Sequence, residues 1–351
     1  MFCSFKVKCI LLFLTLMLIL SACASDQLRP TTAVELTSVQ GEENSPTPLP
    51  TYTPTLAAQG SQENPYLIGL IDATVSENQR KAAEELAAQL SEALGMYFAW
   101  EFFADYLQLE EALQKNIVQF VWLQPIEYIL SAQKQLLTSV LVTNHLGVTA
   151  YGVQFLANSS SNFSTFYDSG TQTSTANAAA ALQQFAGLRP CFISQSSLSG
   201  YWVPNGFLTR SAITTQPPVF TYSTSASIRA LYIKGVCDFA ATYAYFADPR
   251  TSSEIITDLP DALSIVPIIW ASGKIIPNLN LSAAPTLDLA LRNRLAEFLI
   301  QLVRTDNGKQ LITTALDYEV AGLDGLQDGT YDELRSLLRS QGVNLYSLLN
   351  Q

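Results

Sequence analysis

The sequence is poor in charged residues and in histidine. Only 14% of its 351 residues are charged, with 19 Lys and Arg, 30 Asp and Glu, and one His. Nucleic-acid-binding proteins hold phosphate backbones with clustered Lys and Arg, so this shortage argues against a nucleic acid as partner. One histidine and five cysteines also leave little for a metal site built on imidazoles. We expect no metal and no other cofactor.

Apolar residues, in contrast, are abundant and make up 48% of the chain. This content and the length allow one large domain or two smaller ones, each with a packed core. The composition excludes a disordered chain or a coiled coil, which would need more charge or fewer apolar residues. The sequence therefore describes an acidic globular protein with a formal net charge of −11.

The first 22 residues have the pattern of a secretion signal. Lys6 and Lys8 precede an apolar stretch over 10–20, and residues 20–23 read LSAC, which resembles a bacterial lipobox. We expect cleavage before Cys23 and transfer of a diacylglyceryl group to its thiol, which would anchor the chain on the extracytoplasmic face of the cell membrane. An ordinary signal peptide with a chance cysteine and an uncleaved anchor are the alternatives.

Residues 23–64 differ in composition from the rest of the chain. Pro, Thr, Ser and Gln dominate, and no apolar periodicity of a helix or strand can be drawn through the segment. Such a segment buries too little apolar surface to offset its ordering entropy. We expect a disordered tether between the lipid and a globular body.

The body shows strand-like apolar runs that alternate with helix-like stripes. Residues 67–71 form a continuous apolar run, and Ser76 and Gln79 then form a capping box before a striped helix. Such alternation predicts βαβ units and mostly parallel sheets. The pattern restarts near residue 151, and three helices without intervening strands are expected from residue 287 onward. We therefore predict an α/β protein with two lobes and closing helices.

Ligands of open α/β sheets collect at the carboxyl ends of strands, where helix amino termini point. In this sequence, the loops at those positions are rich in hydroxyl, amide and aromatic side chains and poor in charge. They are residues 72–74, 104–106, 123–125, 194–200 and 223–227.

Several of these loops resemble the solute-binding proteins of ABC transporters for phosphate, phosphite and phosphonate. Residues 122–128, WLQPIEY, resemble the family's W-L-G-P-x-x-Y element, and residues 197–204, SLSGYWVP, resemble its serine-threonine-serine-glycine-tyrosine loop ending in V-P. Residues 181–192, ALQQFAGLRPCF, resemble the lead-in to that loop, and residues 270–278, WASGKIIPN, resemble the family's returning strand. The four motifs occur in the family's order.

This resemblance implies a two-lobed periplasmic-binding-protein fold of type II with a double hinge. Lobe 1 would hold residues 65–152 and 272–351, and lobe 2 residues 153–271. The protein would not be an enzyme but a monomer that captures a small oxyanion and delivers it to a permease and ATPase complex. A lipoprotein that signals to a membrane sensor, or one that binds another small solute, is the alternative.

The resemblance also implies a set of ligand-binding residues. Ser197, Ser199 and Gly200 open a helix, where amides and hydroxyls form an anion-sized nest, although plain N-capping uses the same residue types. The family's threonine is replaced by Leu198, and no histidine stands near Ser225, so the exact ligand stays open. The predicted pocket consists of Tyr106, Gln124, Tyr128, Ser197, Ser199, Gly200 and Ser225.

Cys191 and Cys237 are the cysteines left in the body after lipidation of Cys23. Both fall early in predicted strands of lobe 2, and in an exported protein such a pair suggests a disulfide. Two buried free cysteines are the alternative, because strand register decides whether a bridge can form.

An enzyme is the rival class of function. His145 lacks a nucleophile motif such as G-x-S-x-G, so a structural or loop role is the better interpretation. Asp72 and Asp105 could be read as paired carboxylates for acid–base work, but solvated loop caps explain them better.

Overall fold

The computed structural model describes residues 57–349, which belong to one compact unit. The signal peptide, the lipidation site Cys23 and the tether up to residue 56 lie outside the described residues. The tether was expected to extend to residue 64, but residues 57–64 form a folded turn in which the Asn64 side chain donates to the Ala57 carbonyl. In residues 57–349, no helix is both long and apolar enough to cross a membrane.

The first sheet has six strands in the order β14-β4-β13-β3-β1-β2. We call the part of the molecule built on this sheet lobe 1. Its strands are β1 (Tyr66–Ile71), β2 (Phe98–Phe103), β3 (Phe120–Leu123), β4 (Thr138–Asn144), β13 (Asn280–Ala283) and β14 (Gly322–Gly325).

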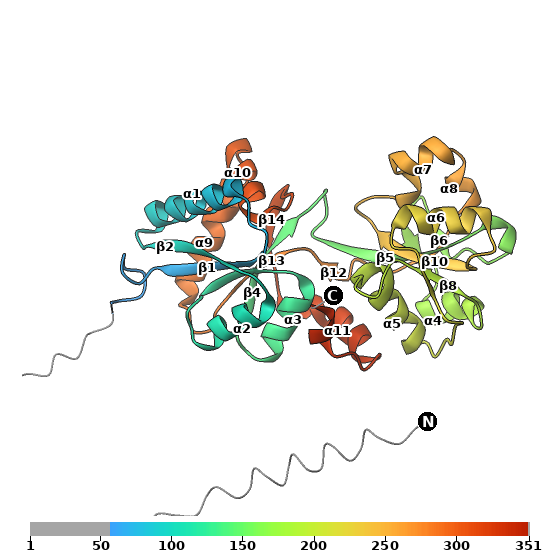
Figure 1. Cartoon of the computed structure of the whole chain (residues 1–351), viewed down its shortest axis with the longest axis horizontal. Helices are drawn as coiled ribbons and strands as arrows, with labels where there is room; N and C mark the ends of the chain where they lie inside the picture. The colour runs from blue at the N-terminus through green and yellow to red at the C-terminus, as the bar shows by residue number, and fades with distance from the viewer. Residues whose placement is uncertain (1–56, 350–351) are drawn as a thin grey trace, which may run out of the picture. The chain divides into compact units, whose positions relative to one another are not determined.

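Helices cover both faces of this sheet (Figure 1). On one face lie α1 (Glu77–Leu94), α9 (Leu289–Leu302) and α10 (Asp306–Leu316), and on the other α2 (Tyr106–Gln114) and α3 (Pro125–Gln133). The predicted capping box at the start of α1 exists in part, because the Ser76 side chain accepts from the Gln79 amide. Gly95 ends the helix in the left-handed conformation that glycine adopts without strain.

The second sheet has five strands in the order β11-β5-β10-β8-β9, and β12 also pairs with β5. We call the part built on it lobe 2. Its strands are β5 (Ala150–Ala157), β8 (Pro190–Phe192), β9 (Val219–Phe220), β10 (Phe239–Ala244), β11 (Ile268–Ala271) and β12 (Ile276–Pro277), and a separate hairpin is formed by β6 (Tyr167–Asp168) and β7 (Thr173–Ser174).

Helices also cover both faces of the second sheet. One face carries α4 (Ala178–Leu182) and α5 (Val203–Arg210), and the other carries α6 (Thr224–Ile233), α7 (Ser253–Asp258) and α8 (Ala262–Ile265). The chain changes sheets between β4 and β5, slightly before the predicted boundary at residue 152, and returns between β12 and β13. Tyr151 of β5 pairs with Ile276 of β12, so the two crossings lie side by side.

The prediction of mostly parallel sheets is wrong in detail, because both sheets are mixed. β13 runs antiparallel to both β3 and β4, and β14 runs antiparallel to β4. β14 also lies between α10 and α11 (Asp332–Arg339), where no strand was expected. Strands β13 and β14 are four residues long each. Both contain polar or glycine residues where a buried strand usually carries branched apolar ones. The sequence pattern therefore gives them little strand signal.

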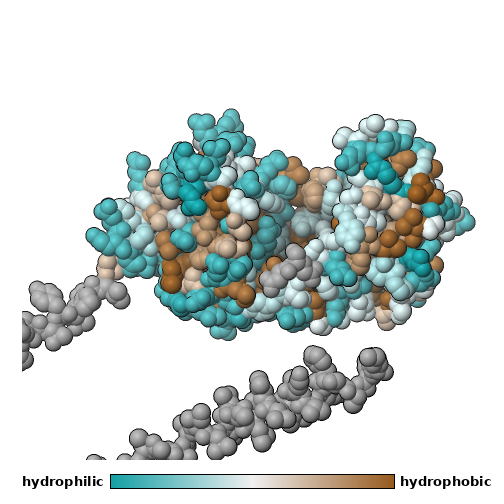
Figure 2. Space-filling model, viewed as in Figure 1, coloured by the Kyte–Doolittle hydropathy of each residue, from teal (hydrophilic) through white to brown (hydrophobic). Residues whose placement is uncertain are grey.

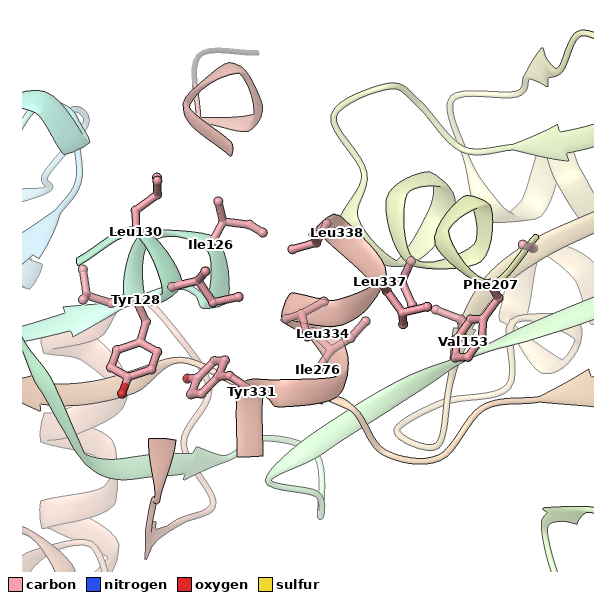
Figure 3. Packing of buried hydrophobic residues seen from close by; sticks show 14 of the residues in the cluster. Ile126, Tyr128, Leu130, Val153, Phe207, Ile276, Tyr331, Leu334, Leu337 and Leu338 are labelled. Atoms are coloured by element: carbon pink, nitrogen blue, oxygen red, sulfur yellow. The ribbon is translucent and has the colours of Figure 1, made fainter. Parts of the chain in front are cut away.

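The C-terminal segment joins the two lobes. Its helix α11 (Asp332–Arg339) follows Tyr331, whose ring centroid lies 4.4 Å from that of Tyr128 in lobe 1. Figure 3 shows Leu334 and Leu337 directed toward Ile276 and Phe207. An ion pair of 2.7 Å between Arg210 of α5 and Glu333 of α11 adds a polar contact. We call residues 328–349 the C-terminal brace.

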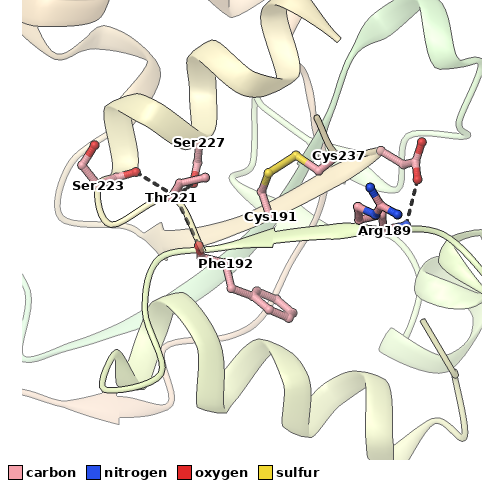
Figure 4. The surroundings of a disulfide bond; sticks show 8 residues. Arg189, Cys191, Phe192, Thr221, Ser223, Ser227 and Cys237 are labelled. Carbon is pink, nitrogen blue, oxygen red and sulfur yellow. Dashed lines mark hydrogen bonds between the residues drawn. A yellow bond between two sulfur atoms is a disulfide. The ribbon is translucent and has the colours of Figure 1, made fainter. Parts of the chain in front are cut away.

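Cys191 and Cys237 form a disulfide between the start of β8 and the residue two before β10 (Figure 4). Their Cα atoms lie 5.6 Å apart. β8 and β10 are parallel neighbours, and the Asp238 amide donates to the Arg189 carbonyl at 2.8 Å just before the two strands begin. The predicted bridge is therefore confirmed, and the alternative of two free thiols is wrong.

Candidate functional site

A short π-helical turn, Leu198–Trp202, follows β8 and leads directly into α5. Its wide spacing is set by the Trp202 amide, which donates to the Ser197 carbonyl five residues earlier at 3.1 Å. Amides in the first turn of a helix have no acceptor within the helix. The amides of Leu198 and Ser199 therefore have no acceptor within the helix and lie at its positive end. We call residues 197–201 the binding turn.

Ser197 and Gly200 build this turn. The Ser197 hydroxyl oxygen accepts from the Gly200 amide at 2.9 Å, so that amide is engaged within the turn. A Cβ on residue 200 would lie 2.3 Å from Cγ1 of Ile193, so only glycine fits. Gly200 was predicted among the ligand-binding residues; the structure shows its amide bonded to Ser197, and its lack of a side chain lets the turn close. The Leu198 amide supplies a donor although its side chain lacks the hydroxyl of the family's threonine.

Tyr151 of β5 lies beside the binding turn, with its hydroxyl next to Ser199. Burial raises the pKa of this hydroxyl to about 12, and the nearby Ser199 hydroxyl partly opposes that rise. The group is therefore a neutral donor at ordinary pH. Tyr151 was not among the predicted residues, because its place at the lobe crossing depends on the pairing of β5 with β12.

The start of α6 lies at the same edge of the sheet. β9 runs beside β8, and the amide of Tyr222 donates to the Ile193 carbonyl at 2.8 Å. The Ser223 hydroxyl oxygen accepts from the Ala226 amide at 3.0 Å, which makes Ser223 the N-cap. Ser225 stands in the first turn of α6 and is partly exposed. The structure therefore brings Ser225 to the edge that carries Ser197 and Ser199.

Lobe 1 contributes a cavity of about 200 Å³ at the carboxyl ends of β1 and β3. Its lining residues are Leu70, Ile71, Asp72, Trp122, Gln124, Glu127, Leu279, Leu316, Asp317 and Tyr318. The exposed Gln124 is the N-cap residue of α3, and its backbone amide donates to the Glu127 carboxylate at 2.7 Å. Burial raises the pKa of Glu127 to about 7, a rise that this hydrogen bond partly opposes.

Tyr318 connects this cavity with the lobe crossing. Its ring lies 4.5 Å from that of His145, whose Nδ1 is 2.9 Å from the Glu319 carbonyl oxygen. These contacts agree with the structural role expected for His145. Burial raises the pKa of the Tyr318 hydroxyl to about 12, and the nearby Tyr151 adds to that rise. A line of aromatic side chains thus leads from the lobe 1 cavity to the binding turn.

Tyr106 and Tyr128 do not join the other predicted residues. The Tyr106 side chain is 3% exposed, and its hydroxyl is 3.0 Å from that of Ser131 inside lobe 1. The Tyr128 hydroxyl donates to Asp328 of the C-terminal brace at 2.7 Å. The prediction placed both tyrosines in the pocket because they follow strands. Their helical positions direct the side chains into the core instead.

The candidate acid–base residues act as caps. The Asp105 carboxylate accepts from the Gln108 amide at 2.9 Å, and that of Asp72 accepts from Thr74 and from the Gln79 side chain. Burial is the largest single contribution and by itself would raise the pKa of Asp72. The hydrogen bonds from Thr74 and Gln79 together outweigh it, so the pKa of Asp72 is lowered. Among residues 57–349, no three His, Cys, Asp or Glu side chains are grouped to hold a metal ion.

Comparison with known proteins gives one family match. Residues 68–331 match the family described as "ABC transporter, phosphonate, periplasmic substrate-binding protein". No curated protein matches the chain.

Solved structures share the fold at low identity. XAC2383 from Xanthomonas citri bound to chloride ion is 15% identical with a TM-score of 0.54, covering 81% of this chain and 98% of that one. The same protein bound to ATP is 15% identical with a TM-score of 0.53, covering 81% of this chain and 97% of that one. Transferrin 1 from Manduca sexta is 10% identical with a TM-score of 0.52, covering 79% of this chain and 47% of that one. The two-lobed α/β prediction is confirmed.

Proposed function

Because the chain belongs to the periplasmic substrate-binding proteins of phosphonate ABC transporters, we propose that it is a lipid-anchored protein that captures a small phosphate-like oxyanion for import. Members of this family are binding proteins and not enzymes. The loaded protein would deliver its ligand to a permease and ATPase complex at the membrane. The chain would act as a monomer.

The binding turn is the observation that carries this proposal. The amides at the start of the turn, together with the hydroxyls of Ser197, Ser199 and Tyr151, form a set of neutral donors. Such donors hold an oxyanion without a formal positive charge. An acidic chain with few Lys and Arg can therefore bind a small anion.

The rest of the proposed site comes from the loops around the binding turn. Ser225 would add a donor from α6, and Gln124 would face the ligand from lobe 1. Figure 2 shows the surface hollowed between the two lobes. Closure of the lobes around a ligand there would bring the Gln124 side chain toward the binding turn.

Thermal denaturation with added solutes tests the oxyanion proposal. We expect phosphate, phosphite or methylphosphonate at 100 times its dissociation constant to stabilise the native state by about 2.7 kcal/mol. Ser199→Ala should weaken this shift, whereas Ser264→Ala, which removes an exposed hydroxyl from α8, should leave it unchanged. Stabilisation by sugars or amino acids without any response to oxyanions would contradict the proposal.

Membrane fractionation tests the lipid anchor. The Cys23→Ser variant lacks the thiol that accepts the diacylglyceryl group, so we expect it to leave the membrane fraction. Cys191→Ala should stay in the membrane fraction, because that cysteine belongs to the folded body. Equal membrane retention of wild type and Cys23→Ser would refute the anchor while leaving the binding proposal untouched.

A further inference from the structure

Aromatic side chains form a wall beside the binding turn. The rings of Tyr243 and Phe246 stack with centroids 4.3 Å apart and an angle of 20° between their planes. The Tyr151 ring meets Phe246 edge-on at 5.4 Å. Tyr151, Tyr243 and Phe246 are each partly exposed. We call these three residues the aromatic wall.

The wall lies at the ligand edge of lobe 2. Tyr243 belongs to β10, Phe246 follows that strand, and Tyr151 belongs to β5. Both strands pack against the π-helical turn that forms most of the binding turn. The hydroxyl of Tyr151 also lies next to Ser199. An oxyanion held by the binding turn would therefore carry its substituent past these rings.

The wall contains no charge that would select a cationic substituent. Residues 239–247 read FAATYAYFA, without an acidic or basic side chain. The acidic residue nearest in sequence, Asp248, is paired with Arg250 at 2.7 Å. The carboxylates of Asp72, Glu127 and Asp317 line the lobe 1 cavity at the ends of β1 and β3 and not the wall, which belongs to lobe 2. Stacked and edge-on rings instead favour a flat apolar partner.

We propose that the ligand is an oxyanion with an aromatic substituent, of the arylphosphonate class, whose ring packs against Phe246 and Tyr243. This inference rests on the proposed oxyanion function of the binding turn. The phosphonate oxygens sit on the neutral donors, and the ring removes apolar surface of the wall from water.

Calorimetric titration of the full body with three ligands tests the inference. We expect phenylphosphonate to bind about tenfold more tightly than methylphosphonate, and 2-aminoethylphosphonate to bind no more tightly than methylphosphonate. Phe246→Ala should abolish the tenfold advantage of phenylphosphonate over methylphosphonate. Phe246→Leu retains apolar volume without a ring and should show the same selective loss.

Phe163→Ala is the matched control, because Phe163 is a partly exposed ring of lobe 2 that packs on Phe185, away from the wall. It should bind both ligands as the wild type does. Equal affinity for phenylphosphonate and methylphosphonate, or a preference for 2-aminoethylphosphonate, would overturn this inference while the proposed function stands. Failure of every phosphonate and of phosphate to bind would overturn both.

Discussion

Replacing Cys191 and Cys237 together by alanine is expected to lower the free energy of unfolding by about 3–4 kcal/mol. The two cysteines are 46 residues apart, and the loop that they close contains the binding turn, α5, β9 and all of α6. Without the bridge, the unfolded chain regains the entropy of that loop, so lobe 2 loses stability. Urea denaturation of the body with and without the substitutions measures the difference.

The single variants provide the control for this prediction. Cys191→Ala and Cys237→Ala each break the same bond, so each should lose most of what the double variant loses. Treatment of the wild type with a reductant should give a similar loss, and the double variant should not respond to it. An unchanged urea midpoint in the double variant would show that the bridge contributes nothing to stability.

Gly200→Ala is expected to reduce oxyanion affinity at least tenfold and to destabilise the body by about 1–3 kcal/mol. The new methyl group would meet the side chain of Ile193 at 2.3 Å and the Ser197 hydroxyl oxygen at 2.7 Å. Because Ile193 lies just after β8, the turn must move and its amides lose their common direction. Titration with methylphosphonate and thermal denaturation measure the two effects separately.

Gly325→Ala is the matched control for this prediction. Gly325 ends β14, and a Cβ there would meet nothing within 4 Å. We expect near-wild-type affinity and stability for this variant. Wild-type binding by Gly200→Ala would show that the binding turn does not hold the ligand.

Local signals in the sequence predict several elements closely. Residues 123–125 were expected to lead from a strand to a helix start, and α3 begins at Pro125, because a proline is favoured at the first position of a helix. The sequence did not decide whether Cys191 and Cys237 form a disulfide, because that depends on the register of β8 and β10. β13 could not be predicted, because Asn280 and Ser282 are buried through a network of hydrogen bonds and not through apolar side chains.

The candidate site was predictable where it depends on one segment. Ser197, Ser199 and Gly200 belong to one turn, and the motif places them together. Tyr151 and Tyr318 are 167 residues apart in the sequence, and no local sequence pattern predicts that they lie close together at the site. Tyr128 was misplaced for the same reason, since the partner of its hydroxyl, Asp328, lies far along the chain in the C-terminal brace.

The central place of β13 in the first sheet has a consequence for synthesis and export. Lobe 2 is one continuous stretch of chain from β5 to β12. The sheet of lobe 1 begins earlier, at Tyr66, but β3 and β4 have no strand between them until residues 280–283 are available. A chain that emerges from its amino end therefore carries lobe 1 as an unfinished sheet with two open edges while lobe 2 can already close. The half of the molecule that appears first is the last to be completed.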